Sequence, residues 1–206
     1  MIYLGLAVLI GGGLILFGVG TGTGGGGLLN GLTGNGSNSA QSQAVNQATK
    51  SALKQVRLAP SSPAAWSGLE QAYWSAAGEG SNYDSATGTY TASGKKLLAK
   101  ATGAWEHYLT LTKNPSADDA ILAARAYAQQ GLYKPEASAW QYVVQSNPSA
   151  VKGYECLAFA AYAGKETRVG DLAAQKAVQL APKLQQLQLK NALKASKTQP
   201  LYAQEC

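Results

Sequence analysis

The hydrophobic positions divide the chain into an apolar beginning, a polar stretch and a long amphipathic remainder. Residues 2–19 carry no charged side chain, and a helix of that length spans about 27 Å, close to the hydrocarbon thickness of a bilayer. We therefore interpret residues 1–20 as a transmembrane anchor in contact with lipid. A cleaved signal peptide is the alternative, but the run has neither a basic leading region nor an Ala-x-Ala site. Its glycines are typical of contact with a partner transmembrane helix.

The polar stretch, residues 21–42, is rich in Gly, Ser, Asn and Thr. Its glycines follow an apolar run, as in a phosphate-binding loop, but no Lys-Ser or Lys-Thr pair follows them directly, as that loop requires. This composition predicts a flexible linker without a bound nucleotide.

Apolar residues at helical spacing return in residues 43–58 and end at Pro60. The same spacing predicts further helices, among them residues 95–112 and a polar amphipathic helix over residues 183–197. Between residues 78 and 94, turn-forming residues surround a short β-prone run, which predicts an ordered loop or a short hairpin.

The segment Ala117–Pro148 resembles one tetratricopeptide repeat (TPR), a unit of two antiparallel helices about 34 residues long. Ala124 stands at the close-contact position of the first helix, Gly131 at the turn and Tyr133 at the start of the second helix. Pro148 ends the unit, because proline cannot continue a helix.

The period of the repeat extends in both directions. Pro115 lies 33 residues before Pro148, and Pro182 lies 34 residues after it. The resemblance implies an all-α fold, a right-handed superhelical stack of about three TPR helical hairpins with capping helices, preceded by one transmembrane helix. We place this domain at residues 43–197, followed by a C-terminal tail at residues 198–206.

The family resemblance further implies binding of other proteins, as a peptide or a helix, in a concave groove lined by the first helix of each repeat. The groove positions carried over from the family are Gln71 and Trp74 in the first repeat, Ile121, Arg125 and Gln129 in the second, and Lys152, Glu155, Phe159 and Tyr162 in the third. For the aromatic members, packing against a neighbouring helix is the alternative role.

The distribution of charge and of reactive side chains narrows the functions that the sequence favours. The net charge of +6 is spread over residues 50–206, which does not favour nucleic-acid binding. The single histidine, His107, has no second ligand at metal-binding spacing, and no catalytic constellation emerges; we predict no metal, no cofactor and no enzyme activity. Cys156 is predicted to be a buried thiol. A bridge to Cys206 requires an oxidising compartment and a tail that folds back.

Together these features predict a single-pass membrane scaffold that recruits proteins, with assistance to protein export or envelope assembly as its candidate role. A structural subunit of a larger membrane complex is the alternative function. Composition favours an extracytoplasmic helical domain, because the insertion is poor in charge and rich in Ser, Thr, Asn and Tyr.

Overall fold

Helices dominate the part of the chain that the computed structural model describes, residues 37–206. The predicted all-α class is thereby confirmed. The predicted anchor at residues 2–19 and most of the predicted linker lie outside the described residues. Among residues 37–206, none of the helices combines the length and the apolar character needed to cross a membrane.

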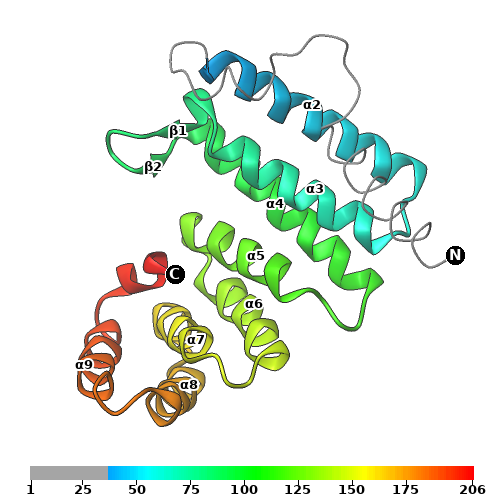
Figure 1. Ribbon diagram of the computed structural model, residues 1–206. Coiled ribbons are helices and arrows are strands. Elements are labelled where there is room, and N and C mark those ends of the chain that lie inside the picture. The colour runs from blue at the N-terminus through cyan, green and yellow to red at the C-terminus, as the bar shows by residue number, and fades with distance from the viewer. Residues whose placement is uncertain (1–36) are drawn as a thin grey trace, which may run out of the picture. The chain divides into compact units, whose positions relative to one another are not determined.

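Consecutive helices pack against each other along the chain, with α3 on α4, α5 on α6 and α7 on α8 (Figure 1). Residues 41–206 form one compact unit. The elements are α2 (Ser37–Leu58), α3 (Pro63–Ala77), η1 (Gly80–Asn82), β1 (Tyr83–Asp84), β2 (Thr89–Tyr90), α4 (Ala92–Leu111), α5 (Ala117–Gln129), α6 (Tyr133–Ser146), α7 (Val151–Ala163), α8 (Thr167–Leu180), α9 (Gln186–Ser196) and η2 (Pro200–Glu205).

The first described helix, α2, begins earlier than the hydrophobic pattern indicates. It starts at Ser37, so residues 37–42 of the predicted linker are helical. The last glycine of the linker is Gly36, and no glycine follows it within α2. The helix can therefore start as soon as the residue type that destabilises helices is absent, with Ser and Asn at its beginning, where they are favoured.

Small side chains let the helices of the centre approach closely. Ala120, Ala123 and Ala124 of α5 are all fully buried. The volume that these alanines leave is filled from neighbouring helices, because Trp105 and Trp140 belong to the same buried cluster. The core therefore alternates small and large residues across its helix interfaces.

The turn between α5 and α6 is the one that the repeat pattern predicts. Gly131 has φ +71°, a conformation that glycine adopts without a steric penalty, and its N–H donates to the carbonyl of Ala128. The second helix begins at Tyr133, as predicted.

The insertion at residues 78–94 contains the predicted hairpin. Tyr83 pairs with Tyr90 in an antiparallel register, and the Asp84 carboxylate accepts a hydrogen bond from the Ala86 N–H at 2.9 Å. Thr91 then caps α4, since its hydroxyl accepts from the Gly94 N–H. The insertion is therefore an ordered element that leads directly into the next helix.

Two glutamates of the core have no hydrogen-bond partner for their carboxyl oxygens among the described residues. Glu70 and Glu136 are both fully buried. Burial raises the pKa of Glu70 to about 9, with a further contribution from the nearby charge of Asp119. Burial raises the pKa of Glu136 to about 8, and the indole of Trp140 offsets this only in part. Both carboxyls are thus protonated at neutral pH.

Replacing Gly94 with alanine is expected to destabilise the protein by about 1–3 kcal/mol, because the new Cβ would collide with the backbone carbonyl of Asn82. The matched control is Gly103→Ala in the same helix, where a Cβ meets nothing within 4 Å. That change is expected to stabilise by about 0.5–1 kcal/mol through helix propensity. Chemical denaturation of both variants measures the difference, and equal effects would contradict the close approach at Gly94.

The free energy of unfolding is expected to fall as pH rises from about 5 to about 8. The folded protein keeps protons on Glu70 and Glu136 that the unfolded chain loses near pH 4.5, so each carboxyl lowers stability by on the order of 1 kcal/mol per pH unit in this window. Glu136→Gln should flatten this dependence, while exposed Glu205→Gln should leave it unchanged. Denaturation at several pH values is the measurement. An unchanged slope in Glu136→Gln would contradict the assignment.

Candidate functional site

An open cleft lies between α3 and α5, the first helices of the first two predicted repeats. Its volume is about 510 Å³. The cleft brings together three of the predicted groove residues and adds three that the sequence analysis did not name. The lining residues are Gln71, Trp74, Ser75, Asp118, Ile121 and Leu122.

A hydrogen bond between the two helices fixes one wall of the cleft. The side-chain amide of Gln71 donates to the Asp119 carboxylate at 3.0 Å and to the Ser67 hydroxyl at 3.2 Å. Asp119 is itself held at the start of α5, where the Ser116 hydroxyl accepts from the N–H groups of residues 118 and 119. The polar side of the cleft is therefore set by a helix cap and does not depend on a flexible loop.

The aromatic side of the cleft depends on the insertion. Trp74 is half-buried, and its ring centroid lies 6.3 Å from that of Tyr90. Tyr90 also contacts Tyr83 across the hairpin, with 5.1 Å between the two ring centroids. Burial raises the pKa of Tyr90, Tyr83 adds to this, and the guanidinium of Arg125 lowers the pKa in part. Tyr90 is a groove-side residue that the family pattern could not reveal, because the insertion has no counterpart in it.

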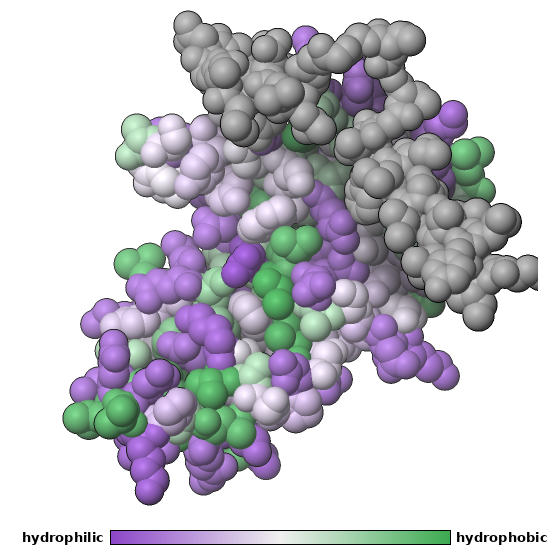
Figure 2. Space-filling view, viewed as in Figure 1, coloured by the Kyte–Doolittle hydropathy of each residue, from purple (hydrophilic) through white to green (hydrophobic). Residues whose placement is uncertain are grey.

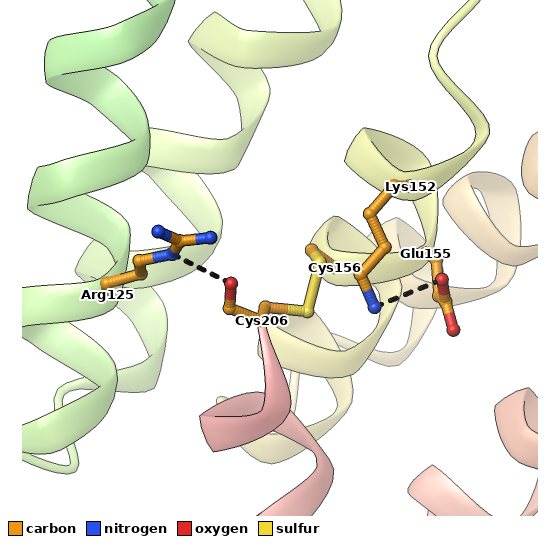
Figure 3. The surroundings of a disulfide bond; sticks show 5 residues. All are labelled: Arg125, Lys152, Glu155, Cys156 and Cys206. Atoms are coloured by element: carbon orange, nitrogen blue, oxygen red, sulfur yellow. Dashed lines mark hydrogen bonds and ion pairs between the residues drawn. A yellow bond between two sulfur atoms is a disulfide. The ribbon is translucent and has the colours of Figure 1, made fainter.

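The other predicted half of the groove, on α7, is covered by the chain's own C-terminal segment (Figure 1). Cys156 and Cys206 form a disulfide, with a Cα–Cα distance of 5.8 Å. The Arg125 Nε donates to the carbonyl oxygen of Cys206 at 2.9 Å (Figure 3). The prediction of a buried thiol at Cys156 is therefore wrong, and the alternative, a bridge to Cys206 in a tail that folds back, is observed.

The covered half differs from the predicted open groove in its aromatic residue. Phe159 is only 2% exposed, and its ring centroid lies 5.3 Å from that of Tyr202 in the covering segment. Its predicted neighbours remain at the rim, where Lys152 forms an ion pair with Glu155 at 3.3 Å (Figure 3). The short η2 element has no hydrophobic period of its own, so the sequence could not place it on Phe159.

The last predicted groove residue, Tyr162, packs between helices. Its hydroxyl donates to the Asp171 carboxylate at 2.8 Å, and Lys197 bonds the same oxygen at 2.7 Å. Burial raises the pKa of Tyr162, and the hydrogen bond to Asp171 adds to this. Tyr162 is therefore buried where α7 meets α8 and the residue that follows α9, which agrees with the alternative role in packing. Gln129 is half-buried at the end of α5.

His107 is exposed, and its ring centroid lies 3.8 Å from that of Trp66. Within residues 37–206, no three His, Cys, Asp or Glu side chains gather in a way that could hold a metal ion. Hydrophobic side chains gather in a strip over the middle of the face shown in Figure 2, among hydrophilic ones.

No model of a known protein family matches this chain. A comparison with curated proteins likewise gives no significant match.

The disulfide is expected to stabilise the domain by at most about 4 kcal/mol, the entropy of closing a loop with a sequence separation of 50 residues. Cys206→Ser should lose this stabilisation in chemical denaturation. Reduction should destabilise the wild type by a similar amount and leave the variant unchanged, which provides the internal control. Titratable thiols in the unfolded, unreduced wild type would contradict the bridge.

Proposed function

We propose that the protein is a single-pass, membrane-anchored scaffold whose TPR-like helical stack binds other proteins in the groove on α3 and α5. The observation that carries this proposal is the open cleft with Gln71, Trp74 and Ile121 on one surface. Partly exposed aromatic and aliphatic side chains beside fixed polar groups are typical of protein interfaces. The binding role does not require any catalytic group.

The arrangement of the helices supports a TPR stack as the finer description of the fold. The pairs α3–α4, α5–α6 and α7–α8 recur along the chain, and α5 and α6 agree in length with the 34-residue pattern. Three such pairs are about the number needed for a stable stack. In this proposal α2 and α9 are the capping helices of a right-handed superhelix.

The cleft favours a peptide or helix with mixed chemistry. Trp74, Ile121 and Leu122 offer an apolar surface, and Trp74 is already fixed against Tyr90. Asp118 is exposed at the rim and accepts hydrogen bonds. A partner that inserts an apolar side chain and places a basic or amide group near Asp118 would match both features.

The disulfide supports an extracytoplasmic domain, because structural disulfides persist in oxidising compartments. Together with the apolar run at residues 2–19, this favours a domain held at the outer side of the membrane. A role in protein export or envelope assembly is the candidate that fits this location. It rests on the order of anchor, linker and repeat stack along the chain.

The test is photo-crosslinking of the full-length chain in cells, with p-benzoylphenylalanine at position 121 in the cleft or at position 132. Leu132 is 44% exposed in the turn after α5 and serves as the matched control. Adducts from position 121 alone, identified by mass spectrometry, are expected. Equal adducts from both positions would contradict a specific site.

Ser75→Arg should remove these adducts, since Ser75 is exposed and its replacement fills the cleft without opening the core. Trp74→Ala is expected to weaken binding of the identified partner by about 30-fold, the effect of losing an interface hot spot. Gln145→Arg, an exposed position on α6, controls for added charge. A single set of partners at constant ratio would instead support the structural-subunit alternative.

A further inference from the structure

We infer that the segment 198–206 is a releasable cover, and that the surface beneath it on α5 and α7 binds a peptide with an aromatic side chain once a dithiol donor opens the Cys156–Cys206 bond. This inference rests on the proposed function, because it concerns the second half of the same groove. It adds a ligand class and a mode of control that the open cleft alone does not indicate.

The cover occupies groove positions with groups that a peptide ligand would use. The Tyr202 ring packs on Phe159, and the Cys206 backbone carbonyl accepts from Arg125. In the first contact, an aromatic side chain packs against an apolar one. In the second, a main-chain oxygen accepts a hydrogen bond from a guanidinium group. Both are general features of peptide recognition, so the segment acts as an intramolecular ligand.

Non-covalent contacts hold the cover weakly. Of its described side chains only Ala203 is buried, whereas Leu201 is 69% exposed. A nine-residue segment that buries one alanine fully and only Tyr202 and Cys206 in part gains little from burial relative to the entropy it loses on ordering. The disulfide therefore dominates its retention, because it keeps the segment at a very high effective concentration over Phe159.

The bond can be opened from the solvent side. Cys156 is fully buried, while Cys206 is partly exposed. A thiolate of the dithiol donor attacks the Cys206 sulfur, and Cys156 leaves as a thiolate that takes up a proton. The donor's second thiol then displaces the Cys206 thiol and becomes part of the donor's own disulfide. Two electrons pass from the donor to the protein, and the two cysteines end as thiols.

Release of the cover would join the two halves of the groove. Ile121 lines the open cleft and Arg125 binds the cover, and the two are four residues apart on one face of α5. Without the cover, the Arg125 guanidinium loses its Cys206 partner and the Phe159 ring loses its covering ring. The surface offered to a ligand then runs from Trp74 to Phe159.

The probe is a fluorescent peptide with the sequence of residues 198–206 and the change Cys206→Ser, so that it cannot form a mixed disulfide. Its anisotropy is measured with the full-length chain. We expect little binding to the oxidised protein and at least about tenfold tighter binding to the reduced protein and to the Cys206→Ser variant. The double variant Tyr202→Ala/Cys206→Ser should bind tighter still, because its own segment competes less well.

Phe159→Ala and Arg125→Ala, each in the Cys206→Ser background, should weaken peptide binding, and Gln145→Ala, at an exposed position on α6, should not. Hydrogen exchange should show that reduction exposes residues 200–206 while α5 to α8 stay protected. Equal peptide binding to the oxidised and reduced proteins would overturn the cover. Absence of peptide binding to every variant would overturn the ligand site. Loss of hydrogen-exchange protection in α7 on reduction would overturn the cover as well, because it would show that the disulfide holds the helices together.

These outcomes are separable from those of the proposed function. Crosslinking from position 121 reports on the open cleft, which exists with the disulfide closed. Partner adducts there, together with failure of the peptide experiment, would leave the scaffold proposal standing and remove only the cover.

Discussion

The close approach of helices that alanine permits is the constraint on which the rest of this structure depends. Ala120, Ala123 and Ala124 have no exposed surface, so α5 lies near its neighbours on several sides. Dispersion contacts at this density stabilise the core although its side chains are small. Glu70 and Glu136 are fully buried on the helices packed against α5, and this burial explains why both carboxyls are neutral at physiological pH.

The groove takes its form from two segments outside the regular helix pairs. The insertion hairpin sets Tyr90 against Trp74 at one end, and η2 sets Tyr202 against Phe159 at the other. Arg125 interacts with both segments, since its charge partly lowers the pKa of Tyr90 and its Nε donates to the Cys206 carbonyl oxygen. These two segments, which lie outside the paired helices, therefore decide how much of Trp74 and Phe159 is accessible.

The features that the sequence predicts correctly depend on interactions between residues that are close together in the chain. The spacing of alanines and aromatic residues predicted the helices. Gly131 predicted the turn after α5, where the backbone has a positive φ. The hairpin followed from turn-forming residues around Tyr90. The errors involve contacts between distant residues: the pairing of Cys156 with Cys206 and the burial of Phe159 beneath Tyr202. Short segments without a period carry no signal of where they pack, so these features needed the three-dimensional structure.

The compartment of the helical domain has a direct consequence for its groove. On an oxidising side of the membrane the Cys156–Cys206 bond forms and persists, so the cover stays on Phe159 unless a dithiol donor acts. On a reducing side the bond would not persist, and the segment would be held by Tyr202 and the Arg125 hydrogen bond alone. Under the proposed function, membrane topology therefore decides the state of the groove, because the side on which the domain lies sets whether the Cys156–Cys206 bond persists.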